Sequence, residues 1–560
     1  MDRSAVETVR RTRDRLVSSV LRRCRYDLPG LWVALVLALL SFTPSLLPRP
    51  PEFQGFLVGV NAAIGYGIGV IGAWMWREFA DRTRLPSRAL SWRILAGTSV
   101  AAGLLAIVVG ERWQRELRDL VGVAEVSWWR LLLIVPIAAV VFVLLVAIGR
   151  TFRAAYRRLA SRLQRRMGDR AARALGLVVL VLGTALIFSG VLWDAAIRLA
   201  DQTYALNDLT TPSEIDQPTS ELRSGGPGSL LDWDTMGREG RIFAASGPDA
   251  ASITDFSGQP AQEPIRTYAG LASAATTEAR AELAVDDLER AGGFERTNLL
   301  VVTTTGTGWV EPSSVASFEY LTGGDSATVS MQYSHLPSWL SFLVDQSRAR
   351  DAGRQLFDAV YERWSALPAG DRPRLYVFGE SLGSFGGETA FSGESDLRNR
   401  IDGALFVGPP NFNPMYREFV DQRDAGSPEV EPIFRDGRTI RFTNRPRDSI
   451  PPDTPWPGTR VLYMQHPSDP VTWWSPDLIL HRPDWLEEPR GRDILPEMRW
   501  APFVTFWQVT ADLPLSFTMP PEHGHTFTGE HVDGWAAVLQ PPGWTAQQAS
   551  RLRAIIRNGT

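Results

Sequence analysis

The chain has 560 residues, too many for one ordinary domain, and its hydrophobic (44%) and charged (21%) fractions are ordinary for a folded protein. A net charge of -4 argues against nucleic-acid binding through bulk positive charge, so no nucleic-acid partner is expected. The single cysteine, Cys24, excludes a disulfide within the chain.

An arginine-rich tail, residues 1–27, precedes five apolar blocks, and each block is about as long as a helix that crosses a bilayer. So many blocks do not fit a signal peptide. Their interiors hold no charged residue that would mark an ion path. We therefore expect residues 28–200 to form an all-α bundle of about five transmembrane helices that serves as an anchor. The blocks are Leu31–Leu47, Phe56–Trp76, Ile94–Val109, Leu131–Ile148 and Leu175–Trp193.

The arginines predict how this bundle is oriented. The N-terminal tail and the segments 77–93 and 150–173 are strongly basic, whereas the loops between the other block ends are not. Because basic segments stay in the cytoplasm, the N-terminus is expected inside the cell. Five crossings then place everything after residue 200 outside the plasma membrane. The protein is thus predicted to be multi-pass, with an extracytoplasmic C-terminal domain.

Residues 201–228 are rich in Thr, Ser, Pro and Gly and are predicted to form an exposed extracytoplasmic linker. From residue 229 to 560, short β-branched or apolar runs alternate with amphipathic helices. Such alternation predicts an α/β domain with a doubly wound, mostly parallel sheet. The expected strands are 264–269, 298–304, 327–333, 375–378, 403–408 and 460–465, and the expected helices are 276–291, 345–364 and 535–539.

One motif stands out in this domain. The strand at 375–378 runs into Gly379-Glu380-Ser381-Leu382-Gly383, which is a G-x-S-x-G sequence followed by small residues. A tight strand-to-helix turn needs glycines on both sides and exposes the serine hydroxyl. Ser381 is therefore predicted to be a catalytic nucleophile, although the same letters also fit a plain glycine-rich turn.

A nucleophilic serine needs an acid and a histidine, which follow it in that order in the α/β-hydrolase arrangement. Asp469 stands in a turn after the strand 460–465, at the carboxyl end where ligands bind. It is the expected acid, ahead of Asp448 and Asp453 in a proline-rich stretch. The alternative interpretation of Asp469 is an aspartate that only stabilises the turn before Pro470.

The chain has six histidines, and three of them, His523, His525 and His531, follow the acid closely. His525 is the preferred base and His523 is the alternative, because both lie in a loop before a closing helix. His531 fits the closing segment itself. Three histidines this close together also fit a metal site, but no acidic ligand motif accompanies them. Neither a metal nor a cofactor is therefore expected.

An acyl-transfer site also needs two backbone donors for the oxyanion. The N–H of Leu382 is one candidate, and the loop 305–309, represented by Thr307, is the other. The stretch 456–507 is crowded with tryptophan and phenylalanine. It is expected to be either the core of a cap subdomain or an apolar wall for an acyl or sugar substrate.

Residues 229–540 resemble the catalytic domain of a family of actinobacterial membrane-bound α/β-hydrolase-like proteins of largely unknown function, and the N-terminal half is similar to the membrane domain that accompanies it. The resemblance implies the fold and a serine hydrolase site, but no substrate. Glu522 stands where a glycine is expected, so both His523 and His525 remain open as the base. The matching stretches are Gly237–Arg241, Thr305–Val310, Gln332–Trp339, Gly379–Gly383, Gly408–Pro410, Gln465–Val471 and His523–His525.

Two functions follow as hypotheses. The first is a membrane-anchored serine hydrolase or acyltransferase that acts on an ester or thioester, with a lipid or glycolipid of the cell envelope as the substrate. The second is a non-catalytic envelope-organising or binding protein on a hydrolase scaffold, because a fold does not imply a function. Hydrolysis and acyl transfer share the acyl-enzyme and differ in the acceptor, and the sequence indicates neither the acceptor nor the oligomeric state.

Overall fold

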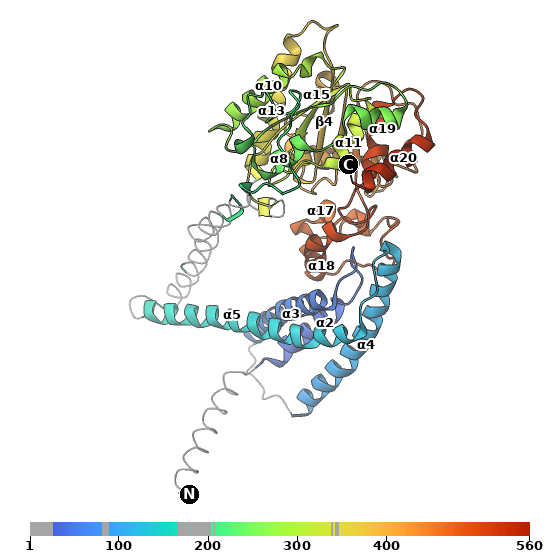
Figure 1. Cartoon of the computed structure of the whole chain (residues 1–560). Helices are drawn as coiled ribbons and strands as arrows, with labels where there is room; N and C mark the ends of the chain where they lie inside the picture. Colours follow the sequence, from blue (N-terminus) through green and yellow to red (C-terminus); the bar gives the residue numbers. More distant parts are fainter. Residues whose placement is uncertain are drawn as a thin grey trace, which may run out of the picture.

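The computed structural model describes residues 26–80, 89–164, 168, 179, 203–205, 208–337, 340–341 and 346–559. Most of the basic tail 1–27, the apolar block Leu175–Trp193 and the pair Ser338-Trp339 lie outside these residues. Figure 1 shows an α/β domain connected through a smaller helical layer to a group of long helices.

The N-terminal part consists of α2 (Leu28–Leu40), α3 (Pro51–Phe79), α4 (Ala89–Val121), the 3-10 helix η1 (Trp128–Leu133) and α5 (Ile134–Leu163). Within the described residues, three helical segments are long and apolar enough to cross a membrane, namely Pro51–Phe79, Ala89–Val121 and Trp128–Arg162. The apolar helices α3 and α5 pack through glycines, since a Cβ on Gly59 would lie 2.7 Å from the Cβ of Val141. These helices are compatible with membrane anchoring.

The prediction of about five spans is corrected at the first block. Leu31–Leu47 forms a helix only as far as Leu40, and a 13-residue helix is too short to cross a bilayer. The helix ends before Pro44 and Pro48, which cannot donate an N–H to continue it. The fifth block, Leu175–Trp193, lies outside the described residues.

The C-terminal part is built on a seven-stranded sheet in which every neighbouring pair is parallel, in the order β1-β3-β2-β4-β5-β7-β6. A parallel sheet of this kind is buried on both faces, which explains the nearly continuous apolar runs in its strands. The strands are β1 (Ile265–Ala269), β2 (Asn298–Thr303), β3 (Ser326–Met331), β4 (Arg374–Glu380), β5 (Gly403–Val407), β6 (Ile440–Thr443) and β7 (Arg460–Met464).

Successive residues of one strand enter different cores. Leu299 and Val301 of β2 pack into one apolar cluster, whereas Leu300 and Val302 pack into another. The first cluster lies under α10 (Thr277–Arg290), α13 (Gln346–Ala366), α14 (Leu382–Glu388), α15 (Glu394–Arg400) and α16 (Pro414–Asp421). The second lies under α8 (Gly237–Ala245), α11 (Pro312–Leu321) and α19 (Glu530–Leu539). The helices therefore cover both faces, as a doubly wound sheet requires.

The expected strands are all present, and β6 at the sheet edge is an addition that the sequence did not indicate. The N-cap of α10 is Thr276, whose side chain accepts from the N–H of Ala279. Two short helices, α9 (Ala250–Ser257) and α20 (Ala546–Arg557), complete the domain. Part of the expected linker packs on the sheet, because Ser224 is fully buried and its N–H donates to Arg266 O of β1 at 3.0 Å.

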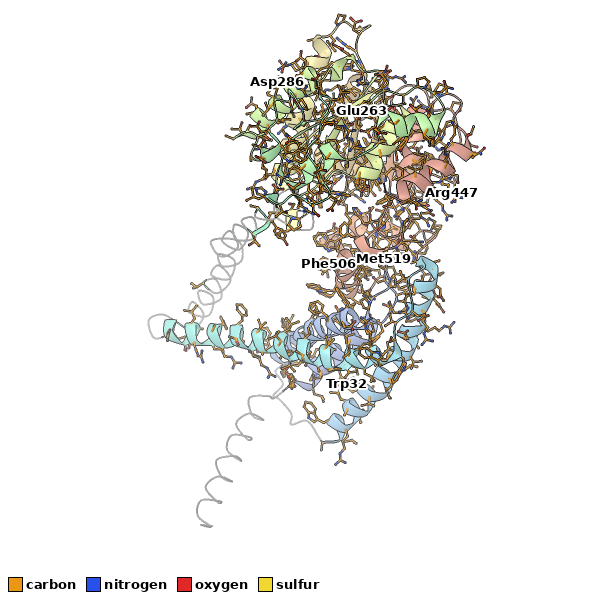
Figure 2. The ribbon with its side chains drawn as sticks, in the orientation of Figure 1. Trp32, Glu263, Asp286, Arg447, Phe506 and Met519 are labelled. Carbon is orange, nitrogen blue, oxygen red and sulfur yellow. The ribbon has the colours of Figure 1, made fainter. Side chains whose placement is uncertain are left out.

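Residues 470–519, named the cap here, lie between the sheet and the long helices (Figure 1). The cap contains α17 (Pro470–Trp473), α18 (Val504–Asp512) and the 3-10 helices η5 (Pro476–Ile479), η6 (Asp484–Leu486) and η7 (Leu513–Thr518). Figure 2 shows Phe506 and Met519 in this layer, above the long N-terminal helices. Both belong to one apolar cluster with the aromatic residues Trp473 and Trp485.

The cap also binds residues 41–50, named the membrane loop here. Leu46 and Leu47 are fully buried in the apolar cluster of the cap. The hydroxyl of Ser45 and the N–H of Leu46 both donate to Asp512 at the end of α18. The segment after the first short helix is therefore a docking element for the cap.

Candidate active site

Ser381 sits in the turn between β4 and α14 with φ 54° and ψ -127°, a backbone conformation that costs energy for any residue with a side chain. The flanking glycines make the turn possible. A Cβ on Gly379 would lie 2.4 Å from Gly383 O, and one on Gly383 would lie 2.3 Å from Thr303 O. The N–H of Ser381 donates to Val407 O at 2.8 Å, which fixes the turn against the end of β5. The motif therefore forms a nucleophile elbow.

Asp469 follows β7 and caps α17, where its Oδ1 accepts from the N–H of Val471 at 2.9 Å. Its other oxygen, Oδ2, lies 2.6 Å from Nδ1 of His525. Both side chains are almost completely buried, at 0% and 2% exposed. A carboxylate in this position fixes the imidazole so that Nδ1 carries a proton and Nε2 is the free base.

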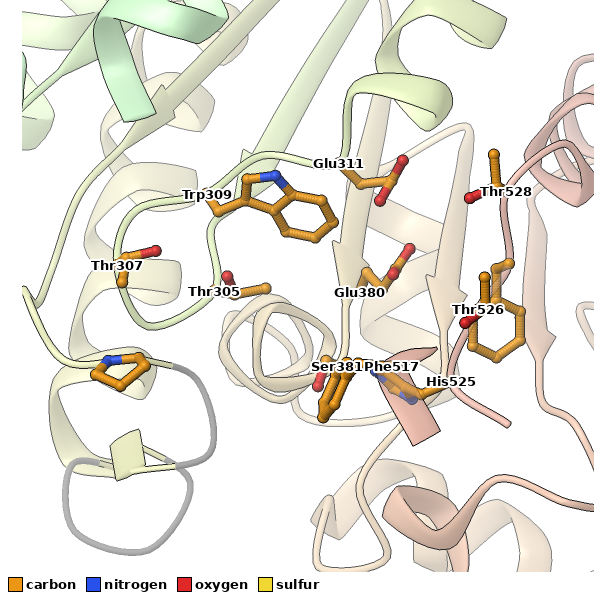
Figure 3. Close-up of a pocket in the computed structure, with 12 residues that line it drawn as sticks. Thr305, Thr307, Trp309, Glu311, Glu380, Ser381, Phe517, His525, Thr526 and Thr528 are labelled. Atoms are coloured by element: carbon orange, nitrogen blue, oxygen red, sulfur yellow. The ribbon is translucent and has the colours of Figure 1, made fainter. Parts of the chain in front are cut away.

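Ser381 and His525 line the same cavity, which has a volume of about 470 Å³ (Figure 3). The imidazole lies against Gly408, the residue after β5, where a Cβ would come within 2.4 Å of the ring. Nε2 of His525 is buried and has no hydrogen-bond partner among the described residues. The other residues that line the cavity are Thr305, Thr307, Trp309, Glu311, Pro337, Glu380, Phe517, Thr526, Phe527 and Thr528.

The electrostatic surroundings of His525 favour its charged form. Burial by itself lowers the pKa of His525, but the charge and hydrogen bond of Asp469, with a further contribution from Glu380, raise that pKa above its usual value. A histidine that gains a proton this readily is suited to accept one from a serine hydroxyl.

His523, the alternative base, does not line this cavity. Its Nδ1 lies 3.1 Å from Oδ2 of Asp493, and the same oxygen accepts from the hydroxyl of Ser468. The Ser468 hydroxyl in turn accepts from the N–H of Gly524 at 2.9 Å. Asp493 thus ties the loop of the acid to the loop of the base. The structure pairs His525, rather than His523, with Asp469.

Two further histidines strengthen the same region. Nδ1 of His466 donates to Gly524 O at 2.9 Å, and its Nε2 lies 2.7 Å from Glu530 Oε2. His531 lies in α19, which is the closing segment expected from the sequence. Its Nε2 lies 2.9 Å from Glu380 Oε2. No group of three or more histidine, cysteine or acidic side chains suited to a metal occurs among the described residues.

Of the two oxyanion candidates, Leu382 is the first residue of α14. The first N–H groups of a helix have no acceptor within that helix, so the N–H of Leu382 is free to bind an oxyanion. Thr307 lines the cavity, and its carbonyl accepts from the Nε2 amide of Gln332 at 3.0 Å. The N–H of Thr307 has no acceptor within the described part of the chain. Both N–H groups are available at the edge that carries Ser381.

The competing acids are elsewhere. Asp448 forms a half-exposed ion pair with Arg445 at 3.0 Å, and Asp453 is exposed. Sequence reasoning missed two residues of the cavity, Glu311 and Glu380, and also the connecting role of Asp493. Glu380 stands inside the G-x-S-x-G motif, and its charge beside the serine was the available signal.

A parallel sheet with helices on both faces and a serine elbow at a strand end defines the α/β-hydrolase class. Comparison with protein families agrees, because the alpha/beta-hydrolase family matches residues 265–552 and the N-terminal region of an alpha/beta-hydrolase family matches residues 42–248. The chain belongs to this α/β-hydrolase family. Comparison with curated proteins and with solved structures gave no match.

Proposed function

We propose that the protein is a membrane-anchored serine hydrolase or acyltransferase that acts on an ester or thioester through Ser381, His525 and Asp469. The observation that carries this proposal is the pair Asp469–His525, because His525 has a buried, unpartnered Nε2 among the described residues and lines the same cavity as Ser381. A strained serine beside a buried, oriented imidazole is the arrangement that acyl transfer requires.

In this reaction His525 Nε2 takes the proton of the Ser381 hydroxyl while Oγ bonds to the carbonyl carbon of the ester. The N–H groups of Leu382 and Thr307 stabilise the oxyanion. His525 then gives the proton to the leaving alcohol or thiol, which leaves an acyl group on Ser381. Water or another hydroxyl, activated by the same imidazole, attacks the acyl-enzyme and restores the serine.

A lipid or glycolipid of the cell envelope fits the surroundings of the site. The cavity has an apolar wall of Phe517, Phe527 and Pro337, and Phe517 is 48% exposed at its edge. The cap that carries Phe517 rests on the membrane loop. A substrate with an acyl chain could therefore reach Ser381 from a nearby bilayer surface.

The arginines support an extracytoplasmic position for the site. The membrane loop contains one arginine, Arg49, whereas the segments 77–93 and 150–173 at other helix ends are rich in arginine. Because the cap packs on the membrane loop, the positive-inside rule favours an outer position for the cap and the sheet. This arrangement needs one more crossing after Arg162, for which Leu175–Trp193 is the candidate in the sequence.

The test is labelling of the purified full chain with a fluorophosphonate, which reacts with an activated serine whatever the natural substrate is. Wild type should label, and Ser381→Ala should not. The exposed Ser392 supplies the matched control, so Ser392→Ala should label like wild type. Folding of each variant is checked by circular dichroism.

Two outcomes decide the matter. Loss of labelling in Ser381→Ala alone supports the enzyme, and the substrate search then starts from lipid esters. A well-folded wild type that does not label contradicts it, and the chain is then a binding protein on a hydrolase scaffold.

A further inference from the structure

The cavity beside Ser381 is acidic. Glu311, from the loop before α11, and Glu380, the last residue of β4, both line it, and none of its lining residues is a lysine or an arginine. Figure 3 shows the two carboxylates one above the other, on the side of the cavity that also holds Trp309. Neither carboxylate takes part in the bond changes proposed at Ser381, although Glu380 contributes to the raised pKa of His525.

The two carboxylates share one buried histidine. Ser313 Oγ donates to Glu311 Oε1 at 2.5 Å, so its lone pair accepts from Nδ1 of His531 at 2.9 Å. Nε2 of the same imidazole lies 2.9 Å from Glu380 Oε2. His531 thus donates from both nitrogens when Glu380 is ionised. When both carboxylates are ionised, they and one imidazolium give this network a net charge of about -1.

The neighbouring charges within this network shift the pKa values of two of its members. Burial lowers the pKa of His531, but its hydrogen bond to Glu380 and the charges of Glu380 and Glu311 raise it overall. Burial and the neighbouring charge of Glu380 raise the pKa of Glu311. An anion in the cavity would add to this repulsion, whereas a cation would relieve it.

Each carboxylate uses only one oxygen inside the network. Glu311 Oε2 and Glu380 Oε1 have no donor among the described residues, and neither is a fully buried atom without a partner. They are therefore accessible from the cavity that both residues line. The indole of Trp309 on the same side can add its negative face to a bound cation.

A second observation points to a ligand in this cavity. The His525 side chain is 98% buried and its Nε2 has no partner within the described residues, although it lines the cavity. The reacting group must therefore enter the same space that Glu311 and Glu380 border. The charge is thus beside the bond that reacts rather than at a remote surface.

We propose that Glu311 and Glu380 form a subsite for a positively charged group, so that the preferred substrate is an ester or thioester with an ammonium group near its reacting carbonyl. The inference rests on the proposed function for its catalytic part. The binding part does not, because the subsite would hold an ammonium ion even if Ser381 were inactive.

The first experiment measures binding without catalysis. Calorimetry on the full chain compares choline, whose positive charge does not change with pH, with 3,3-dimethylbutanol, its neutral analogue in which carbon replaces the nitrogen. The cation should bind at least about 10-fold more tightly, since a cation held against an aromatic face and carboxylates gains that much. Glu311→Gln and Glu380→Gln should each reduce this preference, whereas Glu497→Gln, at an exposed carboxylate outside the cavity, should preserve it.

The second experiment measures turnover. Acetylthiocholine and its carbon analogue, S-(3,3-dimethylbutyl) thioacetate, differ only in charge. Wild type should show a kcat/KM ratio of about 10 or more in favour of the cation, and the Glu311→Gln and Glu380→Gln variants should move this ratio toward 1. The ratio is an internal control for any general loss of activity.

The outcomes separate the two proposals. Equal binding of choline and 3,3-dimethylbutanol by wild type overturns the subsite, whatever the catalytic result. Preferential binding of the cation by a protein that neither labels nor hydrolyses either thioester keeps the subsite and overturns the proposed function. Unchanged preferences in both Glu311→Gln and Glu380→Gln also overturn the subsite.

Discussion

Two regions of the molecule meet at the cavity and are built differently. The sheet edge supplies Ser381, Glu380 and the loop of Thr307, and these residues are positioned by parallel strands and by close glycine contacts. The other wall is irregular. It contains η7 and the loop of His525, where the N–H of His525 donates to Ser516 O at 3.0 Å and Phe517 packs edge-on to its ring at 5.0 Å.

This difference indicates that the two regions depend on different parts of the chain. The sheet edge is supported by its own domain core. The second wall continues directly from α18, whose Asp512 and Gln508 bind the membrane loop. The N-terminal part of the chain is therefore connected to His525 through a short run of packed residues, so it supports the structure of this wall.

The two aspartate–histidine pairs give the largest expected difference. Asp469→Asn should reduce the fluorophosphonate labelling rate by about 10³- to 10⁴-fold, because the imidazole loses the partner that fixes its tautomer. Asp493→Asn should reduce it by only about 10- to 100-fold, because Asp493 positions the two loops without touching His525. Labelling kinetics on both purified variants measure this contrast, and equal losses would show that His523 and His525 act as one unit.

Substitution of two fully buried leucines tests whether the sheet edge and the irregular wall of the cavity are stabilised by separate parts of the chain. Leu405→Ala in β5 should destabilise the sheet domain by about 2–5 kcal/mol, and Leu47→Ala in the membrane loop should cost a similar amount. Hydrogen exchange should show the first loss throughout the strands and the second in residues 470–519. Exchange that rises equally everywhere in Leu47→Ala would contradict separate support.

The pH dependence of labelling tests the electrostatics of His525. The base must be neutral to react, and Asp469 raises its pKa, so the rate should increase with pH through an apparent pKa above that of a free histidine. Glu380 also raises the pKa of His525, so Glu380→Gln should move the midpoint to lower pH. A midpoint that does not move would exclude an electrostatic effect of Glu380 on the base.

The smallest expected effect is at Asp512. Burial raises its pKa to about 6, while the charge of Arg49 and the hydrogen bond from Ser45 oppose the rise. Because the folded pKa exceeds the unfolded one, the stabilising contribution of protonated Asp512 is lost as pH rises through about 6. The midpoint of thermal unfolding of the cap should fall over this range, and less so in Asp512→Asn. The exposed Asp477→Asn is the control and should behave like wild type.

The strands and their order along the chain could be predicted because each has an apolar run buried on both faces. The elbow could be predicted as well, because only glycine fits at positions 379 and 383. The edge strand β6 was missed, since Ile440–Thr443 has only four residues, too few to establish a period of two. The core of a cap subdomain was one of the two interpretations of the aromatic stretch 456–507, and Trp473 and Trp485 do pack in one apolar cluster there.

The sequence by itself determined the class of fold, the position of Ser381 and the short set of partners from which the acid and the base would come. These features depend on local periodicity and on residue types that few other conformations accept. The tertiary structure alone paired His525, rather than His523, with Asp469, joined Glu311 to Glu380 through His531, and turned the end of the first apolar block into a docking loop. These results depend on contacts between residues far apart in the chain, which local sequence patterns do not encode.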